Sequence, residues 1–179
     1  SMGGVVAMKL ASKLNSPANR LILNDVGTFV PGVVFKMIKE TVAERPHAFS
    51  SLEEATDFMT SYVKTFGPMT REMITEMTRN SIRQLPDGHW EMNFDPQIVV
   101  PYEIKEPEDL DLNNEWESII CPTLLLKGEN SPILTPQIIE EMTSCGPKTD
   151  VVEIPDTGHA PHLMSLDQAE IIKNWLLSN

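Results

Sequence analysis

Residues 1–25 read SMGGVVAMKLASKLNSPANRLILND, and this stretch decides the fold class. A glycine-rich turn runs into a segment whose apolar residues recur at helical spacing, which predicts a helix over residues 3–14. A proline-containing loop follows, and residues 21–24 form a short apolar run typical of a buried strand. Asp25 comes directly after that strand. Because ligands bind at the carboxyl ends of parallel strands in α/β proteins, Asp25 is a candidate site residue.

The end of the chain returns to the same alternation of strand and helix. Apolar runs of strand length are each followed by a segment with helical spacing. This pattern predicts a strand at 122–128, a second strand and its following loop over 150–159, and helices at 135–145 and 166–179. Pro136 suits the first turn of its helix. We therefore assign residues 1–30 and 119–179 to one α/β core with a mostly parallel sheet.

Residues 31–118 differ in composition and predict a helical insertion into that core. N-cap signatures and helix-forming residues predict helices over 32–44, 51–66 and 70–85. The acidic stretch EPEDLDLNNEW is typical of an irregular return loop. Methionines recur through the insertion, at Met37, Met59, Met69, Met73, Met77 and Met92. Most should form the core of the insertion, and some could line an adaptable apolar pocket.

Composition excludes several function classes. The formal net charge of −12 and the isoelectric point near 4.7 disfavour binding to nucleic acid or to an anionic membrane surface. No apolar run reaches the roughly 18 residues that a bilayer span needs. Cys121 and Cys145 are too few for a disulfide framework, so we expect free thiols in a reducing compartment, the cytoplasm.

Metal and cofactor motifs are weak or missing in the sequence. His159 and His162 are three residues apart, but no cysteine or carboxylate cluster completes a zinc site. No glycine-rich dinucleotide motif or phosphate-binding loop occurs either. We therefore expect neither a metal nor a cofactor, and a small-molecule substrate with an apolar part.

Ser1, Asp25 and His159 together supply the residue types that nucleophilic catalysis requires. A serine that attacks a carbonyl needs a base to accept its proton, and the base needs an acid to hold its tautomer. Ser1 lies at a glycine-rich turn into a helix, Asp25 ends the next strand, and His159 follows the last strand. The chain order Ser, Asp, His is the order of the α/β-hydrolase fold.

Several motifs resemble that family specifically. SMGG resembles the second half of a G-x-S-M-G-G nucleophile elbow, and LILNDVG is similar to the strand after the elbow helix. CPTLLLKGENSPILTP and IPDTGHAPHL resemble the segments that carry the acid and the histidine in α/β-hydrolase-fold esterases and carbon–carbon bond hydrolases. The resemblance spans nearly the whole chain, with residues 31–118 as the cap. It covers the fold from the elbow onward, which implies that the first five strands and the oxyanion loop lie outside this chain.

The resemblance implies a serine hydrolase that cleaves an ester or a carbon–carbon bond next to a carbonyl. Ser1 would be the nucleophile, His159 the base, and the Met2 N–H one donor of the oxyanion hole. Many relatives carry the acid in a G-x-x-S-D loop, but Pro132 occupies that position here. Other relatives carry it after the strand that follows the elbow helix, so Asp25 is the expected acid and Glu129 the alternative.

Competing interpretations stay open at this point. Ser1 could be a residue left by cloning, and Asp25 could only cap a turn with Gly27. A sheet without its preceding strands exposes an edge, so we expect a second copy or a separate N-terminal half to cover the strand at 21–24. The rival function is a catalytically incomplete fragment that acts as a binding or assembly module.

Overall fold

The computed structural model describes residues 1–43, 48–95, 97 and 107–178. The chain forms two compact units. The first comprises Ser1–Val30, Thr65–Gly67 and Leu110–Asn179, and the second comprises Pro31–Lys64 and Pro68–Asp109. Within the described residues, no helix is long and apolar enough to cross a membrane.

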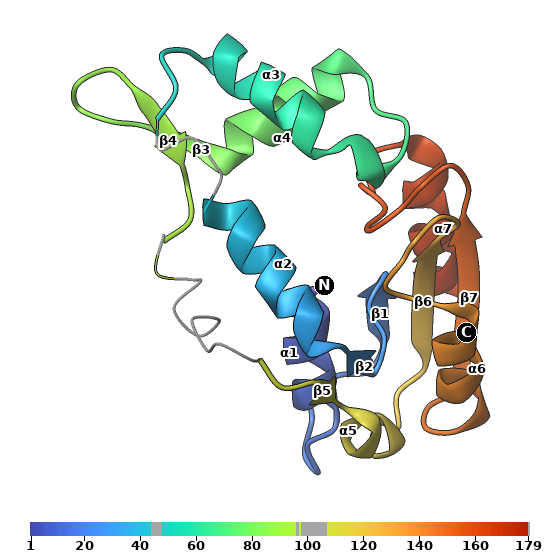
Figure 1. The fold of residues 1–179 in the computed structure, drawn as a ribbon. Coiled ribbons are helices and arrows are strands. Elements are labelled where there is room, and N and C mark those ends of the chain that lie inside the picture. Colours follow the sequence, from blue (N-terminus) through green and yellow to red (C-terminus); the bar gives the residue numbers. More distant parts are fainter. Residues whose placement is uncertain (44–47, 96, 98–106, 179) are drawn as a thin grey trace. The chain divides into compact units, whose positions relative to one another are not determined.

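The first unit contains a parallel sheet of strands β1 (Leu21–Asn24), β6 (Thr123–Gly128) and β7 (Thr149–Ile154). Strand β6 lies between the other two, and all its residues are buried (Figure 1). The sequence predicted β1 and β6 to within one residue at their ends and β7 to begin one residue later than it does, and it predicted the parallel sheet. Since Asn24 pairs with Leu126 and Gly128 with Ile154, the carboxyl ends of the strands share one edge.

Helices α1 (Met2–Ala11), α5 (Asn113–Glu117), α6 (Pro136–Ser144) and α7 (Leu166–Leu177) belong to the same unit. A short antiparallel pair joins β2 (Phe29–Val30) to β5 (Leu110–Asp111). The Trp116 indole N–H donates to the carbonyl oxygens of Met142 and Cys145, at 3.0 and 3.1 Å, and so ties α5 to α6. Trp116 is fully buried in the core of this unit, so residues 110–118 pack there.

Helix α1 approaches β1 closely because of one glycine. A Cβ at Gly4 would collide with the Val26 side chain, whereas a Cβ at Gly3 would meet open space. Met8 and Ala11 then bury their side chains against Leu21 and Leu23. Glycine is therefore required at position 4, because only a residue without a side chain lets the first turn of α1 pack this close to the segment that follows β1.

The second unit contains α2 (Gly32–Ala43), α3 (Leu52–Tyr62) and α4 (Arg71–Ser81), with a hairpin of β3 (Ile82–Gln84) and β4 (Trp90–Met92). The Ser51 hydroxyl accepts the Glu54 N–H, so the cap that the sequence predicted at Ser50 or Ser51 lies at Ser51. The Thr70 hydroxyl accepts the Met73 N–H, which confirms the helix start predicted there. Its core centres on Phe49, Ala55 and Ile82. A 3-10 helix, η1 (Lys64–Phe66), joins α3 to α4.

Some predicted boundaries in the insertion were wrong. The helix expected to reach residue 85 ends at Ser81, because Ile82–Gln84 pairs with β4 across a turn in which Gly88 has φ +91°. The helix expected over 51–66 ends at Tyr62. The acidic stretch expected to be irregular contains β5 and α5. Pairing with β4 across this turn overrode the local helical preference at Ile82.

Candidate active site

Asp25 lies at the carboxyl end of β1, at the shared edge of the sheet. Its backbone is left-handed, with φ 55°, a conformation that aspartate tolerates better than most residues. Its N–H continues the sheet by donating to the Leu126 carbonyl at 2.8 Å, and the residue is 0 % exposed. The turn after β1 therefore points a wholly buried carboxylate toward the end of β6.

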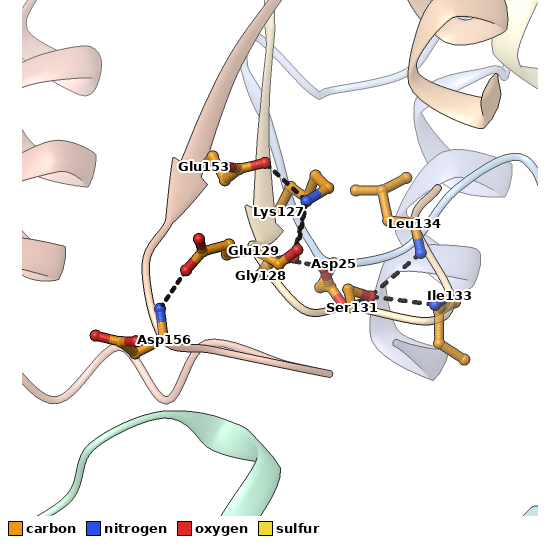
Figure 2. A network of polar contacts seen from close by, with 9 residues as sticks. All are labelled: Asp25, Lys127, Gly128, Glu129, Ser131, Ile133, Leu134, Glu153 and Asp156. Carbon is orange, nitrogen blue, oxygen red and sulfur yellow. Dashed lines mark hydrogen bonds and ion pairs between the residues drawn. The ribbon is translucent and has the colours of Figure 1, made fainter. Parts of the chain in front are cut away.

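Three polar groups, two from the end of β6 and the loop after it and one from the His159 loop, converge on this carboxylate. The Gly128 N–H donates to Oδ1 at 2.8 Å, and the Ser131 hydroxyl donates to Oδ2 at 2.6 Å (Figure 2). His159 Nδ1 lies 2.8 Å from the same Oδ2, although the two residues are 134 positions apart in the chain. A buried carboxylate is costly unless its oxygens accept hydrogen bonds, and these donors meet that requirement.

The His159 loop passes very close to the end of β6. A Cβ at Gly128 would collide with the Gly158 carbonyl oxygen, so glycine is required there for the loop to approach. The Thr157 carbonyl accepts the Asn130 N–H at 2.8 Å, which joins this loop to the one after β6. The His159 side chain keeps 25 % of its surface exposed, so the ring contacts Asp25 on one side and still reaches solvent.

A second backbone contact holds the same loop. The Thr65 carbonyl accepts the Gly158 N–H at 2.7 Å, and the Thr65 hydroxyl donates to the His159 carbonyl at 3.1 Å. Thr65 belongs to the short segment between α3 and α4 that packs with the first unit. The position of His159 thus depends on residues from both ends of the chain and from its middle.

Glu129, the alternative acid, binds a backbone N–H of the loop after β7. Its carboxylate accepts the Asp156 N–H at 2.8 Å (Figure 2), and within the described part of the chain no hydrogen bond or ion pair joins it to His159. The nearby Lys127 ammonium is almost buried and donates to Glu153 and to the carbonyls of Gly128 and Glu129. These contacts fix the backbone after β6 and leave Asp25 as the carboxylate that meets the histidine.

Ser1 lies at the start of α1, where its carbonyl accepts the N–H groups of Gly4 and Val5. Its side chain makes no capping hydrogen bond. Among the described residues, no hydrogen bond joins the Ser1 hydroxyl to His159. Met2 begins the helix, where N–H groups have no intrahelical acceptor.

His162, the other histidine of this loop, faces the beginning of α7. Its Nδ1 accepts the Met164 N–H at 3.0 Å, and its Nε2 lies 3.5 Å from the Gln168 amide. Across the described ranges, no group of three or more His, Cys, Asp or Glu side chains is arranged to hold a metal ion.

Ser131, Thr65 and Lys127 are site residues that sequence reasoning missed. Ser131 lies 106 residues from Asp25, and Thr65 lies 94 residues from His159. Their contacts arise from tertiary structure, and residues of these types are common in loops and strands for other reasons. The one sequence signal was the glycine that ends β6, since a glycine at a strand end often permits close backbone approach.

Comparisons with known proteins cover nearly the whole chain. The model of the alpha/beta hydrolase family matches residues 1–171. A 3-hydroxybutyrate-oligomer hydrolase from Cupriavidus necator is 32 % identical over an alignment that covers 96 % of this chain and 60 % of that protein.

Solved structures show the same fold. A structure of a hydrolase from Rickettsia typhi matches with a TM-score of 0.87 and 32 % identity, covering 98 % of this chain and 59 % of that one. An alpha/beta hydrolase from Novosphingobium aromaticivorans matches with a TM-score of 0.82 and 24 % identity, covering 98 % and 62 %. The chain thus spans about 60 % of the length of the relatives that it matches.

Proposed function

The chain belongs to the alpha/beta hydrolase family, and from this premise we propose that it carries the catalytic residues of a serine hydrolase. The proposed substrates are esters, with a carbon–carbon bond next to a carbonyl as the second bond type. The observation that carries the proposal is the 2.8 Å contact between Asp25 Oδ2 and His159 Nδ1 on a fully buried carboxylate. An imidazole held in this way has the orientation and tautomer that a general base requires.

The proposed reaction has two halves. Asp25 accepts a hydrogen bond from the Nδ1–H of His159, so Nε2 carries the lone pair that takes the hydroxyl proton of Ser1. The Ser1 oxygen attacks the carbonyl carbon, and the imidazolium then protonates the leaving alcohol as the acyl-enzyme forms. In the second half, water attacks the acyl carbon while Nε2 takes its proton, and the imidazolium then protonates the departing Ser1 oxygen as the acid is released.

Met2 is the proposed oxyanion donor of this chain. Its N–H lies at the first position of α1, where the Ser1 side chain makes no cap. Such a group is available to a developing oxyanion, and the helix dipole adds favourable charge. Removing one donor of an oxyanion hole costs roughly 10²–10³ in rate, so the complete hole needs a second donor from elsewhere in the fold.

The proposed substrate class is an ester of a hydroxy acid. The Cupriavidus relative is named for hydrolysis of 3-hydroxybutyrate oligomers, and its identity to this chain is 32 %. We also propose that the second unit, with its methionines, is the cap and lines a pocket for the apolar part of the substrate. Met59 is buried in that unit, whereas Met37 is 59 % exposed, which leaves it available for such contacts.

The proposed partner is the N-terminal half of the hydrolase fold. Met2, Val6 and Leu10 form a stripe along α1 at a spacing of four residues, with exposures of 57, 62 and 52 %. Strand β1 pairs only with β6 in the part of the chain that the structure describes, so its other edge is open. An apolar helix face beside an open strand edge suits the addition of further strands. The same surface favours the rival function, a non-catalytic assembly module.

Ester hydrolysis by matched serine variants tests the proposal. The substrates are a 3-hydroxybutyrate dimer and p-nitrophenyl butyrate, and the protein is the longest polypeptide that the gene encodes around this chain. We expect Ser1→Ala to abolish hydrolysis of both. Ser12→Ala, which removes a hydroxyl that bonds only to the Lys9 carbonyl in the described structure, should leave it unchanged. Full activity of Ser1→Ala would contradict the assignment of Ser1 as the nucleophile. Inactivity of the wild type would favour the rival function, a non-catalytic assembly module.

A further inference from the structure

The loop after β6 contains a serine, Ser131, whose hydroxyl both donates and accepts hydrogen bonds. Ser131 Oγ accepts the N–H groups of Ile133 and Leu134, each at 3.2 Å, and donates to Asp25 Oδ2 at 2.6 Å (Figure 2). Because the two N–H groups occupy its acceptor side, the hydroxyl proton is directed at the carboxylate. A distance of 2.6 Å is typical of a charge-assisted O–H···O bond.

Ser131 and His159 share one acceptor atom. Both contact Oδ2 of Asp25, whereas Oδ1 is bound separately by the Gly128 N–H. The Gly128 bond alone would leave the carboxylate able to rotate about its Cβ–Cγ bond. The Ser131 bond holds Oδ2 at the position where the ring of His159 meets it. Accepted hydrogen bonds also strengthen a hydroxyl as a donor, so the turn at 131–134 contributes to this contact.

We infer that Ser131 is a positioning residue that orients His159 through Asp25. This inference rests on the proposed function, since it assigns Ser131 a role in the same reaction without contact to the substrate. A purely local role, in which the hydroxyl only stabilises the turn at 131–134, is the competing explanation. The two differ in what the imidazole of His159 experiences when the hydroxyl is removed.

Two variants of the same segment separate these explanations. Ser131→Ala removes both the donor to Asp25 and the acceptor of the turn. Thr135→Ala removes an acceptor of the same kind, for the Ile138 N–H at the start of α6, and Thr135 makes no bond to Asp25 within the described residues. Ser131→Thr keeps the hydroxyl and should restore the wild-type behaviour.

The measurements are kcat, KM and the ¹⁵N chemical shifts of the His159 ring, assigned with His159→Gln. We expect Ser131→Ala to lower kcat about tenfold with KM unchanged, as for a lost hydrogen bond to a charged group, and to move the Nδ1 resonance. Unchanged ring shifts in Ser131→Ala, or an equal change in Thr135→Ala, would overturn the inference. If the wild type does not hydrolyse esters, the proposed function fails, and the ring shifts still decide whether Ser131 positions His159.

Discussion

At the scale of single residues, Asp25 and Glu129 illustrate how the environment decides which carboxylate can serve His159. Asp25 is fully buried and meets the imidazole, whereas Glu129 is exposed and binds the Asp156 N–H. Both lie at the carboxyl ends of neighbouring strands. The difference is one of direction, because the left-handed backbone of Asp25 aims its side chain at Gly128.

Neutralising Asp25 should therefore be far more harmful than neutralising Glu129. An amide at position 25 cannot accept the Nδ1 proton in the same way and favours the wrong tautomer of His159. We expect Asp25→Asn to lower kcat for ester hydrolysis by about 10⁴ and Glu129→Gln to change it by less than about threefold. Steady-state kinetics on folded variants measures both, and a larger loss in Glu129→Gln would reverse the assignment.

The two thiols should differ in reactivity. Cys121 is 6 % exposed, and burial raises the pKa of its thiol, whereas Cys145 is exposed. The thiolate is the reactive form, so Cys121 should stay protonated and unreactive at neutral pH. With a chromogenic disulfide reagent we expect only Cys145 of these two to react in the native protein, and Cys121 to react after unfolding. Cys145→Ser should abolish the native reaction; rapid modification that persists in this variant would contradict the expectation.

The raised pKa of Cys121 also has a consequence for stability. The folded state favours the neutral Cys121 thiol. The resulting contribution to the free energy of unfolding is fully present below the pKa that this thiol has in the unfolded chain. It is lost as the pH rises through the folded pKa. The free energy of unfolding should therefore fall at alkaline pH, and less so in Cys121→Ala than in the wild type.

At the scale of elements, the His159 loop is held by segments that are distant in sequence. The end of β6 contacts it through Gly128, and the segment at η1 contacts it through both the carbonyl and the hydroxyl of Thr65. Several backbone contacts restrict the movement of a loop, so a histidine on that loop keeps its ring in a better defined position. The Thr65 contacts are thus part of the geometry that presents the imidazole.

Removing the Thr65 hydroxyl should reduce catalysis modestly. One net hydrogen bond contributes about 1 kcal/mol, so we expect Thr65→Val to lower kcat about threefold to fivefold without changing KM, and Thr65→Ser to restore it. Thr143→Val, which removes a hydroxyl bonded to the Ile139 carbonyl in α6, is the matched control. Equal losses in Thr65→Val and Thr143→Val would show that the effect is not specific to the loop.

Helices and strands with strong local sequence signals could be predicted from the sequence. Those that form because they pair with another segment of the chain could not. The apolar run at 21–24 and the caps at Ser51 and Thr70 are local, and the structure has them where they were expected. Ile82–Gln84 continued a helical pattern but forms a strand, because β4 pairs with it. The resemblance to the family implied the pairing of Asp25 with His159, whereas Ser131 was missed because its partner is set by tertiary structure.

At the scale of the whole molecule, the first unit combines a well-packed side and an open side. Strand β6 is covered on both edges, and Leu124, Leu125 and Leu126 are buried. In contrast, Val6 and Leu10 on α1 are exposed, and within the described residues β1 pairs along only one of its edges. In a chain that spans about 60 % of its relatives' length, this surface is where we propose that the rest of the hydrolase fold packs.

This surface should make the chain associate when it is purified by itself. We expect sedimentation velocity to show species larger than one chain, and Val6→Glu to shift them toward the monomer because the charge breaks the apolar stripe. Leu177→Glu is the control, since Leu177 is 73 % exposed on α7 rather than on α1. A wild-type chain that sediments as a clean monomer would contradict the proposed docking surface.

We propose that Ser1 is a nucleophile activated by the pair of His159 and Asp25. The most direct test of this proposal is to treat the folded protein with a fluorophosphonate probe and to locate the adduct by peptide mass mapping. We predict a single adduct on the Ser1 hydroxyl, formed at least about a thousandfold more slowly in His159→Gln and in Asp25→Asn. An adduct on another serine, or no adduct under conditions that label a known serine hydrolase, would contradict the account.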